Sequence, residues 1–148
     1  MLTNIISFLL EWITLNTHYD ASIFKFEVIE LSKSEIQALA CGGKCPVIAF
    51  FKPELGILIS ELDYKNICNQ SILLHEIIHA LQYLNESNLE NAFKEKEAYQ
   101  IQNKFLMEIS IKEELIDFLN LKKCRSSFGR VTFTCCHGQR TLTKPRSV

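Results

Sequence analysis

The chain has 148 residues, of which 47% are hydrophobic and 22% are charged, and its net charge is −1. These values are typical of a single globular domain with its own core, and they exclude a low-complexity chain. The apolar run over residues 5–10 is too short to cross a bilayer and has no basic residue before it, so we expect neither a membrane span nor a signal peptide. The first arginine is Arg125, which argues against an arginine-rich transit peptide. We therefore expect a cytoplasmic, monomeric protein.

Charge is divided unevenly along the chain. All seventeen acidic residues lie before residue 118, whereas seven of the sixteen Lys and Arg residues follow it. A basic end on an acidic body favours an anionic partner, packing against its own body, or simple solvation. Few aromatic residues alternate with these bases, so the pattern gives no strong indication of nucleic-acid binding.

Apolar periodicity predicts, in chain order, a helix over residues 2–19, a strand over 23–31, a helix over 32–40, a hairpin of strands over 47–51 and 56–60, helices over 69–84, 89–109 and 110 to about 120, and a strand around 131–134. Capping patterns open the helices that begin at Ser32 and Ser110. This order predicts a small α+β domain over residues 1–120. A basic, cysteine-containing extension over 121–148 is expected to pack on it and to end in about a dozen mobile residues.

The expected helix over 69–84 contains the sequence SILLHEIIHAL at residues 71–81, in which His75, Glu76 and His79 interrupt an apolar surface. Ionisable groups in such a place need a partner or a metal. In this HExxH pattern the two histidines lie one helical turn apart, so both imidazoles can bind one Zn²⁺. The glutamate between them is then free to act as the general base. The alternative is a core helix with two satisfied histidines.

A catalytic zinc site needs a third protein ligand. A longer motif with Gly at 82 and His at 85 is absent, since Gln82 and Asn85 stand there. On the following helix, Glu97 falls between Phe93 and Ile101 on the expected core-facing stripe, and we predict that it is the third ligand. A structural salt bridge of Glu97 is the alternative. Glu95 points to the other margin of this helix, and Glu90 sits at its start, where a carboxylate often serves only the helix dipole. His18 and His137 are the outside candidates for the third ligand.

The HExxH motif followed by a glutamate on the next helix resembles the gluzincin branch of zinc metallopeptidases. The segment over residues 73–80 is similar to the core of the SprT/Spartan-like proteases and of the mitochondrial ATP-synthase-processing metallopeptidase family. The histidine that completes the Spartan site is missing, because none lies between His79 and His137. The second family shares further short segments, at Cys41-Gly-Gly43, Glu97-Ala98, Thr134-Cys135 and Thr141-Leu142, but its cysteine-rich segment after the motif is absent. The resemblance implies a zincin-like core, with a short twisted sheet on the motif helix and the third ligand on a second helix.

These residues predict a zinc-dependent endopeptidase acting on a protein or peptide substrate. Zn²⁺ held by His75, His79 and Glu97 would activate a water molecule, and Glu76 would take its proton. A further donor to the developing oxyanion is expected from Tyr64, Tyr83, Tyr99 or His18, with nothing to select among them. The alternative is an inactive zincin-fold binding module that acts through its basic C-terminal tail.

Six cysteines leave three interpretations open. Cys41 and Cys45 have metal-ligand spacing, and Cys124, Cys135, Cys136 and His137 offer further ligands for a second metal. The same cysteines suit disulfides in an oxidising compartment, and inert thiols are the third interpretation.

Overall fold

The computed structural model describes residues 1–112. Its elements are, in chain order, α1 (Leu2–Asn16), η1 (Ala21–Ile23), β1 (Val28–Leu31), α2 (Lys33–Cys41), β2 (Ala49–Lys52), β3 (Gly56–Ser60), α3 (Ile67–Leu84) and α4 (Asn91–Lys112). The expected α+β class is confirmed. No helix within the described range is both long and apolar enough to cross a membrane.

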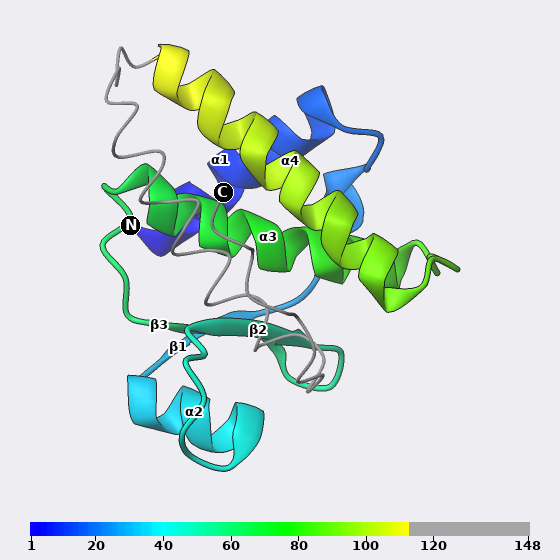
Figure 1. Ribbon diagram of the computed structural model, residues 1–148. Coiled ribbons are helices and arrows are strands. Elements are labelled where there is room, and N and C mark those ends of the chain that lie inside the picture. Colours follow the sequence, from blue (N-terminus) through cyan, green and yellow to red (C-terminus); the bar gives the residue numbers. More distant parts are fainter. Residues whose placement is uncertain (113–148) are drawn as a thin grey trace, which may run out of the picture.

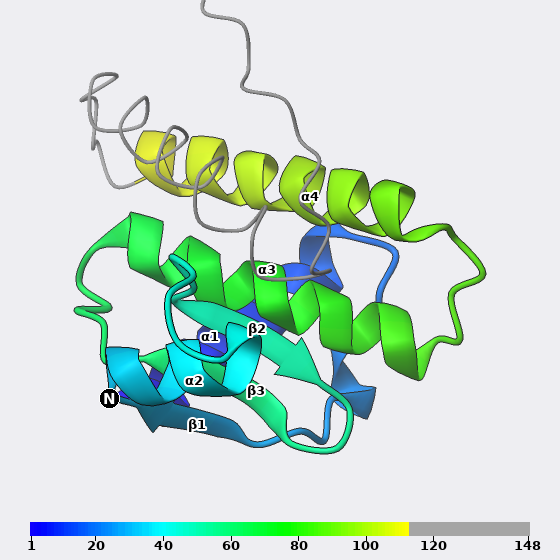
Figure 2. The same ribbon diagram turned by 60° about the horizontal axis from the view of Figure 1, so that its bottom comes forward.

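The three strands form one mixed sheet in the order β1-β3-β2. β3 pairs in parallel with β1 and antiparallel with β2, so β2 is an edge strand and forms the expected hairpin with β3. Helix α3 lies between the sheet and α4, whereas α2 covers the opposite face of the sheet (Figure 1). The view in Figure 2 shows the same layers, with α4 lying across α3 on the side away from the strands.

Side chains that alternate between the two faces of the sheet form a separate core on each face. Ile57 and Ile59 point into the large core that α1, α3 and α4 complete. Leu58 and Phe50 point the other way and pack against Ile36 of α2. Successive side chains of a strand face opposite sides, so a five-residue strand whose every residue is buried serves both cores.

Local hydrogen bonds set the bounds of the helices. The side chain of Asn66 accepts from the backbone N–H of Cys68 and starts α3, two residues before the expected position. The capping box of Ser32 and Glu35 is present as predicted. Ser110 does not cap a new helix, because α4 runs through it and its hydroxyl donates to the carbonyl of Leu106. The expected strand over 23–31 shortens to its last four residues.

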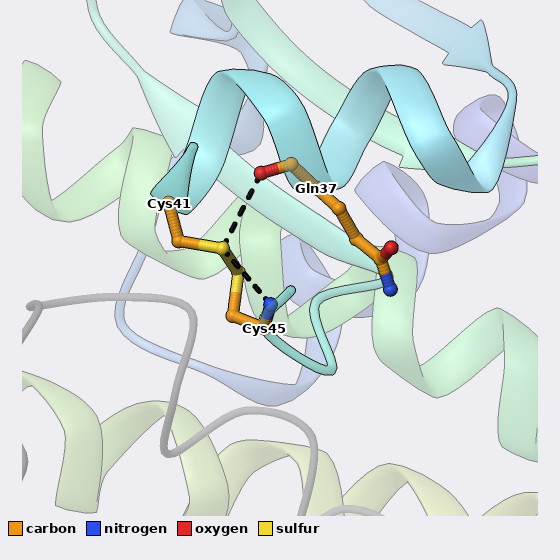
Figure 3. The surroundings of a disulfide bond; sticks show 3 residues. All are labelled: Gln37, Cys41 and Cys45. Carbon is orange, nitrogen blue, oxygen red and sulfur yellow. Dashed lines mark hydrogen bonds between the residues drawn. A yellow bond between two sulfur atoms is a disulfide. The ribbon is translucent and has the colours of Figure 1, made fainter. Parts of the chain in front are cut away.

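Cys41 and Cys45 form a disulfide at the C-terminal end of α2 (Figure 3). Their Cα atoms are 6.1 Å apart, and the bridge closes the loop that contains Gly42, the left-handed C-cap of α2. For this pair the structure selects the disulfide among the three interpretations. The other predicted ligands of a second metal, Cys124, Cys135, Cys136 and His137, lie outside the described residues, as does the basic extension.

Gly56 is required where β3 begins. Its φ is +94°, and a Cβ placed there would lie 2.5 Å from the carbonyl oxygen of Glu27, which accepts the N–H of Ile57. We expect Gly56→Ala to lower the free energy of unfolding by roughly 2–3 kcal/mol, because it adds a backbone clash to left-handed strain. Urea denaturation followed by Trp12 fluorescence measures this change.

Gly42→Ala is the matched control for Gly56→Ala. Gly42 has a φ of +76°, but a Cβ added there would meet nothing within 4 Å, so this change carries the conformational strain alone. It should cost about 1 kcal/mol. If the two variants lose the same free energy of unfolding, the contact with Glu27 does not add to the cost of a side chain at residue 56.

Candidate metal centre and active site

Helix α3 carries the HExxH residues in the interior of the molecule. Eleven of its eighteen residues are buried, among them His75 and Glu76, which are both 0% exposed. The side chain of His79 is 10% exposed. Burying unpartnered ionisable groups costs several kcal/mol each, so these three side chains require compensating interactions from the elements around them.

The structure brings together His75, His79 and Glu95. One ligand atom from each of the three side chains lies within 4.8 Å of the others, and within the described range no other group of three or more His, Cys, Asp or Glu residues meets this condition. The Nε2 atoms of the two histidines are 3.0 Å apart. Glu95 places Oε1 2.8 Å from Nε2 of His79 and Oε2 3.4 Å from Nε2 of His75.

This donor set fits a zinc ion. Zinc binds imidazole nitrogen and carboxylate oxygen at about 2.0–2.2 Å, so neighbouring ligand atoms of a tetrahedral site lie about 3.3 Å apart. The two Nε2 atoms, 3.0 Å apart, are close to this edge length, and each of them lies within 3.4 Å of one of the two carboxylate oxygens of Glu95. Three protein ligands leave a fourth position for water or substrate, as in catalytic rather than structural sites.

The predicted third ligand, Glu97, does not lie with the two histidines, and Glu95 takes its place. The choice of Glu97 depends on Phe93 being part of the core-facing stripe of α4, but Phe93 is 55% exposed. The buried stripe follows Ala98, Gln102 and Phe105 instead. Extending that stripe by one turn toward the helix start reaches Glu95, three residues before Ala98. Of the other candidates, His18 stacks on Tyr19, and His137 lies outside the described residues.

Glu97 has a different set of partners. It accepts hydrogen bonds from the hydroxyl of Tyr19 and from Nε2 of Gln82, the latter at 2.9 Å. The same amide nitrogen of Gln82 donates to the carbonyl of Lys94 at 3.0 Å. Oε1 of Gln82 lies 2.9 Å from Nδ1 of His79, so Glu97 acts on that histidine through Gln82.

A second glutamine lies behind the other histidine. Oε1 of Gln102 is 2.9 Å from Nδ1 of His75, and its amide nitrogen is 3.3 Å from Oγ of Ser71. Gln82 and Gln102 are each 1% exposed. Sequence reasoning overlooked both. A glutamine in the buried stripe of α4 was the available signal for Gln102, whereas Gln82 gave none beyond its place one turn after His79.

The ionisable side chains of the site shift one another's pKa values. Burial alone would raise the pKa of Glu95, but hydrogen bonds and positive charge from His75 and His79 outweigh it and hold that pKa well below its usual value. Burial likewise lowers the pKa of His79, but Glu95 and Glu76 outweigh it, and the net shift is upward. Glu95 is therefore ionised at neutral pH, which is the form that binds metal.

Glu76 and His79 line a pocket. The pocket has a volume of about 260 Å³ and is lined by Phe51, Pro53, Glu76, His79, Gln82, Tyr83, Asn91 and Lys94. Neither carboxylate oxygen of Glu76 has a hydrogen-bond partner among the described residues, although the backbone of Phe51 lies close enough to act on its pKa. Burial raises the pKa of Glu76, and the two histidines oppose the shift. A buried carboxylate in this position suits proton transfer to and from a molecule in the pocket.

Two of the four predicted oxyanion donors approach the site. Tyr83 lines the pocket and is 54% exposed, while the ring of Tyr99 packs on that of His75 with centroids 4.7 Å apart. Tyr64 is buried away from the pocket, and burial together with Glu30 raises its pKa to about 12. His18 does not line the pocket either.

A larger depression of about 530 Å³ lies elsewhere, between α1 and the end of α4. Its ionisable residues are Glu11 and Glu108, and Glu108 accepts from the indole N–H of Trp12. Two carboxylates without a histidine do not make a zinc site of the kind described above. The pocket of about 260 Å³, in contrast, is lined by Glu76 and His79, so a substrate bound there would contact reactive side chains.

Zinc binding should depend on pH through His79. In the zinc-free protein the pKa of His79 lies above its ordinary value of 6.5. Protonated His79 must lose a proton before it can bind zinc. The apparent affinity should therefore rise about tenfold per pH unit below that pKa and level off above it. Calorimetric titration in two buffers of different ionisation enthalpy measures the released proton. A constant affinity from about pH 5.5 to 8 would contradict this assignment of His79.

The family described as "Domain of unknown function (DUF6647)" matches residues 2–122, so the chain belongs to this family. No curated protein and no solved structure matches the chain. The matched range includes every residue of the site, from Tyr19 to Gln102. The description of the family names no reaction.

Proposed function

We propose that this DUF6647 chain is a zinc-dependent peptidase of the HExxH type. The observation that carries the proposal is the convergence of His75, His79 and Glu95 beside the fully buried carboxylate of Glu76. Two imidazoles, a carboxylate ligand and a separate carboxylate base are the parts that metal-assisted hydrolysis uses. A structural zinc site would not require the fourth side chain or the adjoining pocket.

The residues divide the chemical work between binding and proton transfer. Bound Zn²⁺ supplies Lewis acidity, which activates water at neutral pH and polarises the scissile carbonyl. Glu76 accepts a proton from the attacking water as the new carbon–oxygen bond forms. It then gives that proton to the amide nitrogen as the carbon–nitrogen bond breaks, so the products are a carboxylic acid and an amine.

The sheet edge offers a peptide a path to these groups. β2 is one of the two edge strands of the sheet, and Phe51 on it lines the pocket together with Glu76 and His79. An extended peptide that pairs with this edge would pass the reacting groups. Phe51 and Tyr83, whose ring centroids are 5.9 Å apart, supply an aromatic wall for an apolar side chain.

Exposure of the zinc-loaded protein to a broad library of denatured proteins tests the activity. We expect new internal peptide termini, with large apolar residues enriched on one side of the cleaved bond. A zinc chelator should stop their formation and added zinc should restore it. A protein that binds one zinc but generates no new termini from any library would contradict the peptidase assignment.

A further inference from the structure

Both zinc-ligand histidines meet a glutamine amide on the side away from the site. We propose that Gln82 and Gln102 are positioning residues that hold His79 and His75 as the tautomer with hydrogen on Nδ1, and that Glu97 and Tyr19 lock Gln82 in this orientation. The purpose of the arrangement rests on the proposed zinc site, but its geometry does not. It explains why two glutamates of α4 lie at the site while only one has the position of a ligand.

Hydrogen-bonding partners fix the orientation of the Gln82 amide. Its nitrogen faces two acceptors, the carbonyl of Lys94 and the carboxylate of Glu97, at 3.0 and 2.9 Å. A flipped amide would place its oxygen against both acceptors, which is repulsive. Oε1 of Gln82 must therefore face Nδ1 of His79, 2.9 Å away. An amide oxygen only accepts, so Nδ1 must carry the hydrogen.

The same reasoning applies to Gln102 through Ser71. The hydroxyl of Ser71 donates its hydrogen to the carbonyl of Cys68 at 2.7 Å, so its oxygen accepts from the amide nitrogen of Gln102. The amide oxygen of Gln102 then faces Nδ1 of His75, which must also donate. One acceptor fixes Gln102 and two fix Gln82, so the orientation of Gln82 is the more strongly determined.

With Nδ1 committed to a glutamine, Nε2, the atom that each histidine points toward Glu95, is the nitrogen whose proton a metal replaces. The rings are thus oriented for a metal before it binds, and the entropy of ring rotation is not lost on binding. Tyr19, which precedes η1, anchors Glu97 and so extends the support of His79 beyond α3 and α4. Partners of this kind commonly alter metal affinity by about 10–100-fold.

Histidine-ring nitrogen spectra of the ¹⁵N-labelled full chain test the tautomers directly. The chain has four histidines. The variants His18→Asn and His137→Gln identify the signals of those two rings, so the signals that remain belong to His75 and His79. In the zinc-free and the zinc-loaded wild type we expect hydrogen on Nδ1 of both His75 and His79. A bare Nδ1 on either ring overturns the inference, whether or not zinc binds. Hydrogen on both Nδ1 atoms in a protein that takes up no zinc would uphold the inference while the proposed function fails.

Variants measure what the two glutamines contribute. We expect Gln82→Leu and Gln102→Leu each to weaken zinc binding about 10–100-fold in competition with a chromophoric chelator. Gln102→Glu keeps the acceptor for His75, and Ser71 can turn its hydroxyl toward it, so this variant should bind nearly as well as wild type. Gln100→Leu, an exposed change on α4, is the matched control. Thermal unfolding identifies any variant that does not fold. The tautomers are read from the wild-type spectra, so they do not depend on whether a variant folds. Unchanged zinc affinity in folded Gln82→Leu would overturn the positioning role.

Discussion

Glu76→Gln should abolish peptide hydrolysis while the protein keeps its fold and its zinc. Glu76 is 0% exposed, lines the pocket and is not among the three residues whose ligand atoms converge. The amide has the size of the carboxylate but cannot take a proton from water, so the rate should fall by roughly 10²–10⁴-fold. Turnover of a peptide identified from the library, measured at equal zinc content, checks this expectation.

The same variant should also be more stable than the wild type at neutral pH. Burial raises the pKa of Glu76 in the folded state. Above the pKa that Glu76 has in the unfolded chain, its ionisation therefore favours the unfolded state and lowers the free energy of unfolding. A neutral amide removes that cost. Hydrolysis retained at the wild-type rate by zinc-loaded Glu76→Gln would place the base elsewhere or reveal a contaminating protease.

Glu95→Ala should remove zinc far more effectively than Glu97→Ala. In the proposed site Glu95 offers a ligand atom to the metal, whereas Glu97 reaches His79 through Gln82. Loss of an outer partner costs about 10–100-fold in metal affinity, and loss of one of three direct ligands should exceed that range. Zinc affinities of the two variants, measured side by side by chelator competition, separate these effects.

Two further substitutions make the comparison of Glu95 and Glu97 specific. Glu90→Ala removes a charge just before α4 and should leave zinc affinity unchanged. Glu95→Asp keeps the charge but shortens the side chain, and it should weaken zinc binding through lost reach. A protein that loses zinc with Glu97→Ala but keeps it with Glu95→Ala would restore the ligand assignment predicted from the sequence.

Much of the fold could be predicted from periodicity and caps. The hairpin of β2 and β3 and the capping box of α2 follow from short-range patterns, which depend on neighbouring residues alone. Failures occurred where distant partners decide the structure. Residues 24–27 have the pattern of a strand, but this segment lies before β1, and its Phe26 packs with Phe51 and Tyr83. Ser110 has the sequence of a helix cap, yet its hydroxyl is satisfied within α4.

The site shows the same division between local and distant information. His75, Glu76 and His79 follow from spacing on one helix, because that spacing alone places both imidazoles on the same face. The choice between Glu95 and Glu97 depends on the rotation of α4 about its axis, and the exposed Phe93 misdirected it. The partners of Gln82 lie 12 and 15 residues away on another helix, a distance that no periodicity reports.

The most direct test of the proposed zinc site is to locate zinc in a crystal of the purified protein, by anomalous scattering on both sides of the zinc absorption edge. We expect one anomalous peak bonded to Nε2 of His75, Nε2 of His79 and a carboxylate oxygen of Glu95, at about 2.0–2.2 Å from each. Elemental analysis of the same sample should find that zinc in the absence of added metal. A protein that purifies without zinc and takes none up, or a peak bound elsewhere with these three side chains left unliganded, would contradict the proposed site.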